Sequence, residues 1–118
     1  MVVSDDGGNI FAIDVQRFSV IQTIKAHKGQ AFVVEYFDAD KKKVASIGND
    51  GILKKWRKVD GNYILDKEVK AHNSPCCTLF YNDDGTKLLT GGQDGWLKIW
   101  DAKSMQLIMG LNTNADTL

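Results

Sequence analysis

The chain of 118 residues has no long hydrophobic run and no excess of either charge. No apolar stretch approaches the ~20 residues that a helix needs to span a bilayer, so membrane insertion is not expected. Fifteen basic residues balance fifteen acidic ones, which gives no indication of a polyanion or a charged membrane as partner. The first residues, MVVSDDGGN, lack the basic and apolar regions of a signal peptide.

Cysteine and proline are also scarce, because the chain has two cysteines and one proline. Cys76 and Cys77 are adjacent, and neighbouring side chains of a strand point to opposite faces, so a disulfide between them is not expected. Both are interpreted as small buried hydrophobic residues. Without a spaced cysteine framework, a reducing compartment is favoured. We therefore expect an intracellular protein, cytoplasmic or nuclear.

The chain does contain a repeated stretch. Residues 88–101 read LLTGGQDGWLKIWD, and residues 44–57 read VASIGNDGILKKWR. Each copy predicts two short strands joined by a tight turn, because apolar β-forming residues flank an Asp-Gly pair. The copies align without a gap at a spacing of 44 residues (90 − 46), which places Ser46 on Thr90, Asp50 on Asp94, Gly51 on Gly95 and Trp56 on Trp100.

A period of roughly 40–45 residues with a terminal Trp-Asp and an upstream His is typical of a four-stranded propeller blade. The chain resembles the WD-repeat β-propeller family over nearly its whole length. The resemblance implies an all-β fold with two full blades and partial ones. We expect a partial blade and outer strand in residues 1–26, full repeat units in 27–70 and 71–110, and a polar tail or the start of a further loop in 111–118.

The outer strands of these blades are predicted at residues 18–24, 63–65 and 105–109. About eleven strands are expected in all, which is fewer than three blades. Propellers typically close with four to eight blades. The chain is therefore expected to be a fragment of a larger propeller, whose remaining blades come from a longer chain or from other copies.

Each full unit contains a His, a hydroxyl, an Asp and a Trp. In the family that the chain resembles, such a set forms a buried hydrogen-bond network within a blade. The chemistry supports this role, because a buried Asp needs a partner, a His ring N–H can supply one, and the hydroxyl can bond the other ring nitrogen or the indole. The two sets are His27, Ser46, Asp50 and Trp56, and His72, Thr90, Asp94 and Trp100.

Both units depart from the family pattern at their ends. Each begins with Ala-His where Gly-His is usual, and the first ends in Trp-Arg where Trp-Asp is usual. Neither change removes a member of the network. In the partial blade, Ile13 stands at the position of the Trp.

The same residue types also occur in the nucleophilic triad of a hydrolase. The duplication argues against that alternative, because an active site is seldom repeated in successive blades. No further Cys or His lies at ligand spacing from His27 or His72, which disfavours zinc. We therefore expect no catalytic residue, no metal and no cofactor.

Partners of such propellers usually dock on the face with the loops into the inner strands and the tight Asp turns. The alternative is that these positions are only the polar ends of strands. Trp96, directly after the second turn, is either a core residue or an interface anchor. Register from each His and Asp assigns to this face Gln30, Phe32 and Asn49 in the first unit, and Pro75, Cys77 and Gln93 in the second.

Two basic runs, residues 41–43 and residues 54–58, are interpreted as a solvated turn and as part of the repeat. A nucleic-acid surface needs a continuous basic stripe with exposed aromatic residues, and the sequence shows none. Nucleic acid is therefore not an expected partner.

These observations favour a non-catalytic scaffold for protein–protein interaction in a multiprotein assembly, with proteins or peptides as partners. One alternative is a subunit that recognises a substrate or a modified peptide for an enzyme complex, such as a ubiquitin ligase. Residues 100–103, WDAK, lack the Arg two places after Asp that such adaptors often have. A hydrolase is the less favoured alternative.

Overall fold

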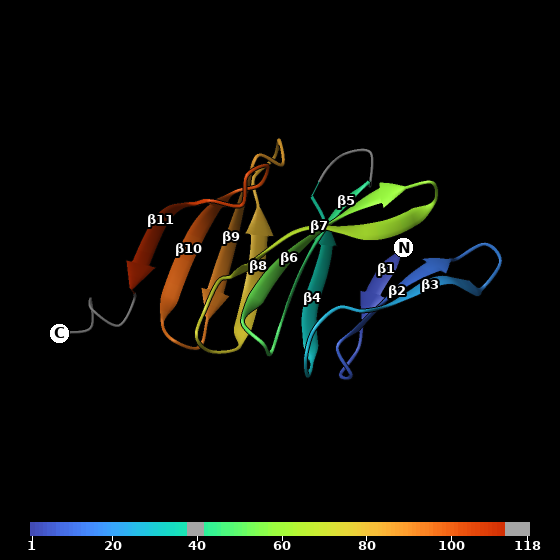
Figure 1. Ribbon diagram of the computed structural model, residues 1–118, viewed down its shortest axis with the longest axis horizontal. Coiled ribbons are helices and arrows are strands. Elements are labelled where there is room, and N and C mark those ends of the chain that lie inside the picture. The colour runs from blue at the N-terminus through green and yellow to red at the C-terminus, as the bar shows by residue number, and fades with distance from the viewer. Residues whose placement is uncertain (38–41, 113–118) are drawn as a thin grey trace.

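The computed structural model describes residues 1–37 and 42–112, which form eleven strands and no helix. The strands make three antiparallel sheets that stand side by side (Figure 1). The first sheet has the order β1-β2-β3, with β1 (Val2–Ser4), β2 (Asn9–Asp14) and β3 (Ser19–Lys25). Within residues 1–37 and 42–112 there is no helix that could cross a membrane.

The second and third sheets each contain four strands. The second is β4 (Ala31–Tyr36), β5 (Lys43–Gly48), β6 (Ile52–Val59) and β7 (Asn62–Lys70). The third is β8 (Cys76–Tyr81), β9 (Lys87–Gly92), β10 (Trp96–Asp101) and β11 (Leu107–Asn112). In both sheets the strands lie in sequence order, as expected of propeller blades.

The repeated stretch forms the two middle strands of each four-stranded sheet. Ser46 pairs with Lys54 across β5 and β6, and Thr90 pairs with Lys98 across β9 and β10. The two units therefore share one register as well as one spacing.

The outer strands differ from the predicted ranges. Strand β3 begins after Phe18 and β11 begins after Met105, because both residues have positive φ angles (52° and 61°) and lie in the turns. Strand β7 continues to Lys70, well beyond the predicted end at Leu65, because the charged residues pair with β6. Strand β11 extends to Asn112, into the predicted tail.

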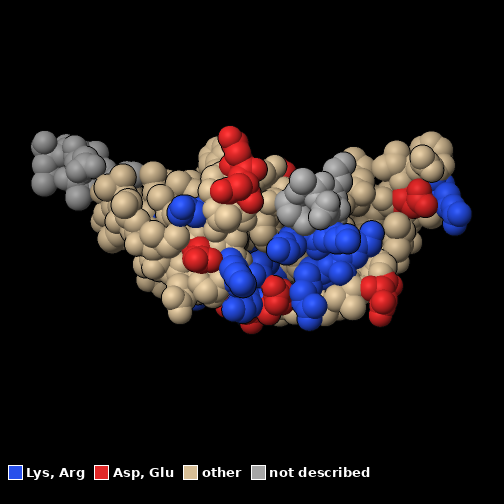
Figure 2. Space-filling view, turned by 90° about the horizontal axis from the view of Figure 1, so that it is seen from above, with Lys and Arg blue, Asp and Glu red and all other residues tan. Residues whose placement is uncertain are grey.

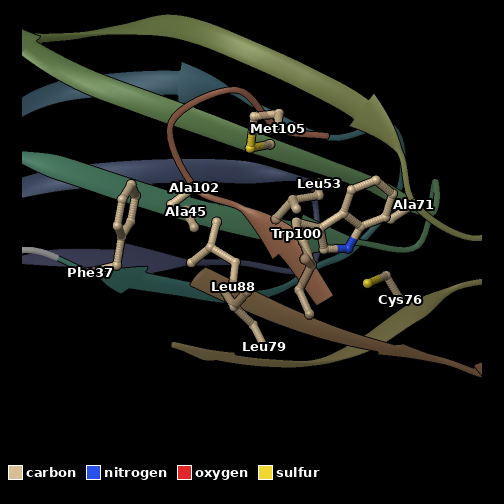
Figure 3. Close-up of a cluster of buried hydrophobic side chains, with 11 residues drawn as sticks. Phe37, Ala45, Leu53, Ala71, Cys76, Leu79, Leu88, Trp100, Ala102 and Met105 are labelled. Carbon is tan, nitrogen blue, oxygen red and sulfur yellow. The ribbon is translucent and has the colours of Figure 1, made fainter. Parts of the chain in front are cut away.

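Two apolar layers fill the spaces between the sheets. One lies between the first and second sheets and includes Ile10, Val44 and Trp56. The other lies between the second and third sheets and includes Leu53, Leu88 and Trp100 (Figure 3). The second sheet is therefore covered on both faces.

The third sheet is covered on one face only within the described ranges. On its other face, Phe80 is 63% exposed, and a shallow hollow of about 300 Å³ is lined by Phe80, Leu89 and Ile99 among others.

The antiparallel order sends alternate loops to opposite edges of the row of sheets (Figure 1). One edge contains the turns 49–51 and 93–95 and the loops 26–30 and 71–75, and we call it the Asp-turn edge. The opposite edge contains the turns 59–62, 82–86 and 102–106. The segment 38–41, which includes the start of the predicted turn at residues 41–43, lies outside the described residues.

Candidate functional site

The structure brings His27, Ser46, Asp50 and Trp56 together in one hydrogen-bonded chain. His27 Nδ1 lies 3.0 Å from Asp50 Oδ1, and His27 Nε2 lies 2.8 Å from Ser46 Oγ. The indole Nε1 of Trp56 donates to the same Ser46 Oγ at 2.9 Å. His27 and Ser46 are buried, with 2% and 0% of their surface exposed.

The partners of the His27 ring determine its protonation state. The Asp50 carboxylate can only accept, so Nδ1 carries the proton. In the neutral ring Nε2 then accepts from the Ser46 hydroxyl, whose oxygen accepts from the Trp56 indole. Every donor in this network of four residues therefore has one acceptor. A second ring proton on Nε2 would displace the hydroxyl proton from its acceptor.

The pKa values of the pair have the directions that this arrangement requires. Burial lowers the pKa of His27 below 6.5, and the opposing effect of Asp50 does not restore it. Burial alone would raise the pKa of Asp50, but the Ile52 backbone N–H, the His27 ring and the Lys28 backbone N–H stabilise its carboxylate. The pKa of Asp50 therefore lies below 3.8. A neutral His beside an ionised Asp is the resulting state.

The second unit repeats the geometry. His72 Nδ1 lies 3.1 Å from Asp94 Oδ1, and His72 Nε2 lies 2.9 Å from Thr90 Oγ1. Trp100 Nε1 donates to Thr90 Oγ1 at 2.9 Å. Burial raises the pKa of Asp94, but the Trp96 backbone N–H and the His72 ring outweigh it, so this pKa lies below 3.8.

Glycines at equivalent positions make room for both His rings. A Cβ on Gly48 would lie 2.9 Å from His27 Cγ, and a Cβ on Gly92 would lie 2.6 Å from His72 Cγ. The sequence interpretation did not assign a role to either glycine. Their spacing of 44 residues (92 − 48), equal to that of the networks, is the signal that could have identified them.

A glycine in each turn also holds the next unit. Gly51 has a φ of 72°, and its carbonyl accepts from the backbone N–H groups of Ala71 and His72. Gly8, with a φ of 84°, holds the N–H groups of Ala26 and His27 in the same way. Each Ala-His pair is therefore fixed both by its own network and by the preceding sheet.

Lysines repeat in the same register. Lys54 Nζ lies 5.9 Å from the ring centroid of Trp56, and Lys98 Nζ lies 6.0 Å from that of Trp100. Lys98 also donates to the Ala71 carbonyl at 2.6 Å, whereas Lys54 pairs with Glu68 at 3.6 Å. Each lysine therefore lies at a cation–π distance from the Trp of its own network.

Lys55 differs from every other lysine of the described chain, because it is only 5% exposed. Its Nζ donates to the carbonyls of Ala102 and Lys103 at 2.7 and 3.0 Å and lies 3.2 Å from Asp66 Oδ2. It therefore joins the second sheet to a turn of the third. From the sequence, the run 54–58 was interpreted as part of the repeat, and nothing there indicated that Lys55 is buried.

The remaining candidates for chemistry have little capacity for it. The hydroxyls of Ser46 and Thr90 are 0% exposed and already bonded. Burial raises the pKa of the Cys76 thiol to about 12. Cys77 is exposed, so the interpretation of both cysteines as buried was wrong for Cys77. Among the residues placed by the structure, no group of three or more His, Cys, Asp or Glu side chains could hold a metal.

The predicted docking residues of the first unit meet at the Asp-turn edge. Asn49 N donates to the Gln30 carbonyl at 2.8 Å, and both residues are exposed. The Gln30 side chain donates to Asp6 Oδ1 at 2.9 Å, which links it to the first sheet. Phe32 lies in strand β4, but its side chain lies outside the described part of the structure.

The docking residues of the second unit meet at the same edge. Gln93 N donates to the Pro75 carbonyl at 3.0 Å, and Cys77 Sγ lies 3.7 Å from that carbonyl. Trp96 begins β10 directly after the turn 93–95, where its backbone N–H donates to Asp94 Oδ1 at 3.1 Å. It pairs with Asn112 of β11 and is 36% exposed, so it is not a core residue.

Comparison with known proteins supports the repeat assignment. The family model "WD domain, G-beta repeat" matches residues 63–101. The chain is similar to the "WD repeat-containing protein WDS homolog" of Arabidopsis thaliana, with 30% identity over 82 residues, 69% of this chain and 16% of that protein. It is also similar to the "Mitotic checkpoint protein bub3" of Dictyostelium discoideum, with 37% identity over 78 residues, 66% of this chain and 22% of that protein.

A chain of the same fold occurs in a solved structure, "Crystal Structure of Mitotic Checkpoint Complex". The TM-score is 0.84 at 20% sequence identity, and the match covers 96% of this chain and 36% of that one. The present chain thus spans only a small part of the proteins that it matches. Its repeat spacing, its four-stranded antiparallel sheets and these matches agree, and the chain belongs to the WD-repeat β-propeller family.

Proposed function

We propose that the chain is a non-catalytic scaffold that binds proteins or peptides at its Asp-turn edge, within a multiprotein assembly. The observation that carries this proposal is the contrast between its buried and exposed polar groups. The networks are closed and buried, while Gln30, Asn49 and Gln93 are exposed on turns that those networks hold. Exposed uncharged groups on rigid turns suit the recognition of a protein surface.

The networks themselves favour a structural role over hydrolysis. A nucleophile needs access to its substrate and a base that is ready to take its proton. Here the Ser46 oxygen is inaccessible and accepts the Trp56 indole N–H, and Thr90 has the same contacts in the next unit. Two identical closed networks are better suited to fixing loops than to catalysis.

The open face of the third sheet supports a further part of the proposal. Leu89 and Leu97 occupy the positions of Ala45 and Leu53, which are fully buried against the third sheet. We therefore propose that another blade, from a longer chain or from another copy, packs on this face. The names of the relatives are consistent with a cytoplasmic or nuclear protein, which is the location that we propose.

The test is affinity capture from cell extract with the wild-type chain and with the variant Gln30→Arg, Asn49→Arg and Gln93→Arg. The matched control places the same number of arginines at exposed positions of the opposite edge, Asn62→Arg, Asp83→Arg and Gln106→Arg. We expect a set of proteins to be lost only with the first variant, while both variants melt close to the wild type. Capture of the same set by all three chains would refute the proposed edge.

A further inference from the structure

The first and third sheets contain equivalent turns between their last two strands, at residues 14–19 and 101–106. In each turn the leading Asp side chain accepts from the backbone N–H groups two and three residues later. Each turn also follows a bulge in the pairing of its two strands. Phe18 and Met105 occupy the same position in the two turns, with φ angles of 52° and 61°.

The two turns differ in what covers them. In the third sheet Ala102 and Met105 are 4% and 6% exposed, because they belong to the apolar layer that also contains Ala45 of the second sheet (Figure 3). In the first sheet the equivalent residues, Val15 and Phe18, are 53% and 91% exposed. The first sheet therefore presents, in water, a turn of the kind that packs on a neighbouring sheet elsewhere in the same chain.

The open face of the third sheet has the surface on which such a turn packs. Its hollow of about 300 Å³ is lined by Leu89 and Ile99 among others. By strand pairing these two residues stand at the positions of Ala45 and Lys55 in the second sheet. Ala45 lies in one layer with Met105, and Lys55 donates to carbonyls of the turn after β10. The hollow therefore lies where the second sheet receives its turn.

The open face is also more apolar than its covered counterpart. A row of paired residues across the third sheet consists of Phe80, Leu89, Ile99 and Met109. The equivalent row of the second sheet consists of Glu35, Ala45, Lys55 and Lys67. Lys and Arg side chains gather over the middle of the molecule, and the end formed by the third sheet is mostly uncharged (Figure 2). An aromatic side chain such as Phe18 suits this face.

From these observations we propose that a second copy of this chain covers the open face, with Phe18 of one copy in the hollow beside Leu89 and Ile99 of the other. The inference rests on the proposed function, in which another blade packs on this face, and it names the source of that blade. The turn and the hollow lie at opposite ends of the row of sheets (Figure 1), so each copy can give its turn to the other and receive a turn in return. Two copies together contain six sheets, three from each, which is within the four to eight blades of closed propellers.

The contact also needs a donor for the carbonyls of the incoming turn. On the second sheet this donor is Lys55, and Ile99 cannot replace it. Lys87 lines the hollow of the third sheet and stands at the position of Lys43, which lines a hollow together with the turn 101–106. In the pair of copies, the Lys87 ammonium group donates to these carbonyls in place of Lys55.

The test measures the mass of the 118-residue chain by sedimentation equilibrium over a wide range of concentration. We expect the wild type to form pairs with twice the mass of one chain. Phe18→Asn removes the ring and keeps a residue that tolerates a positive φ. Phe80→Glu places in the hollow the residue type that the second sheet has at Glu35. Each variant should raise the dissociation constant at least about tenfold.

A matched control changes an exposed apolar residue outside the turn and the hollow. Ile64 of β7 is 40% exposed and serves this purpose. Ile64→Asn and Ile64→Glu repeat the two chemical changes, and we expect both to pair within about twofold of the wild type.

Mixing the two variants distinguishes a turn in a hollow from two open faces that pack on each other. Phe18→Asn retains the hollow and Phe80→Glu retains the turn, so an equal mixture can form one intact contact. We expect the mixture to associate more tightly than either variant alone.

A further measurement needs no variant and remains decisive if a substitution unfolds the chain. Methyl NMR spectra of the wild type are compared at low and high protein concentration. We expect the methyl signals of Leu89 and Ile99 to shift as the Phe18 ring enters the hollow, and those of Ile64 to stay unchanged.

Several results would overturn the proposal. The mass of a single chain at every concentration, with unchanged methyl signals, would leave a blade of a longer chain as the occupant of the open face. Loss of pairing in Phe80→Glu but not in Phe18→Asn would show two open faces in contact. Equal weakening by the Ile64 variants would show unspecific association. The variant with arginine at Gln30, Asn49 and Gln93 should pair as the wild type does, so a failure of the proposed Asp-turn edge is distinguishable from a failure of this contact.

Discussion

The two full repeat units have the same network but different surroundings. The second sheet is packed on both faces, and its Lys55 reaches into the third sheet. The third sheet is packed on one face, and Ile99 stands at the position of Lys55. The His–hydroxyl–Trp network is therefore a property of each repeat, whereas the packing of a sheet's faces depends on its neighbours. Substitutions and changes of pH test this separation.

The largest effect is expected from removing the histidines. His27→Ala and His72→Ala each leave a buried hydroxyl and a carboxylate without their partner, and we expect a loss of about 2–4 kcal/mol from the free energy of unfolding. His27→Ala should cost more, because its sheet is packed on both sides. Urea denaturation followed by tryptophan fluorescence gives both values. A loss below about 0.5 kcal/mol in both would contradict a structural network.

The next effect concerns the glycines beneath the rings. Gly48→Ala and Gly92→Ala place a Cβ against His27 and His72, so we expect each to cost about 1–3 kcal/mol through displacement of the ring. Gly61→Ala serves as a control without a clash, because a Cβ there meets no atom within 4 Å, although its φ of 85° adds backbone strain. Thermal denaturation compares the three. If Gly61→Ala melts lowest, backbone strain outweighs the proposed clash.

Lys55 provides the sharpest difference between the units. Lys55→Ala leaves the Ala102 and Lys103 carbonyls without their donor, and we expect a loss of about 1–3 kcal/mol. Lys55→Met keeps the apolar stem and should cost less. Lys54→Met, at an ion pair with an exposed Glu68, should change stability by less than about 1 kcal/mol. Equal losses for Lys54→Met and Lys55→Met would contradict a special role for Lys55.

The smallest effect is the pH dependence of the first network. Because burial lowers the pKa of His27 in the folded chain, the unfolded chain binds more protons as the pH falls below 6.5. The stability from the neutral ring is thus complete above about pH 6.5 and decreases on acidification toward the folded pKa. We expect the melting temperature to fall between about pH 7 and pH 5, and His27→Gln to reduce that slope. An unchanged slope in His27→Gln would contradict this assignment.

The carboxylates of both networks act at lower pH. The pKa values of Asp50 and Asp94 are below 3.8 in the folded chain, so their contribution is complete above about pH 4 and decreases as the pH falls through the folded values. Below about pH 4 the two units should therefore lose stability together, in contrast to the effect of His27 at milder pH.

Much of the fold follows from residues that are local in sequence. The period of 44 residues (90 − 46) and the Asp-Gly turns predict the middle strands, and their register brings the network residues together. The outer strands were predicted less well, because an exposed strand such as β7 lacks the apolar alternation that marks a half-buried one. Phe18 and Met105 also adopt positive φ angles, for which residues of their types give no signal.

The features that escaped prediction depend on the neighbouring sheet. Lys55 belongs to a charged run in the sequence, and only the turn at Ala102 and Lys103 makes its position buried. Lys43 in β5 and Arg57 in β6 are likewise brought side by side only by the pairing of their strands. A one-dimensional pattern contains the charges but not the distances between them.

The contact of Lys55 with the third sheet also has a consequence for the order of folding. The His27–Asp50 bond closes a loop of 23 residues, whereas the Lys55–Ala102 bond spans 47. Loop closure costs more entropy as the loop lengthens, and contacts between distant residues slow folding. Each network can therefore form within its own repeat first. The Lys55 contact forms after two finished sheets meet, and it makes the unfolding of one depend on the other.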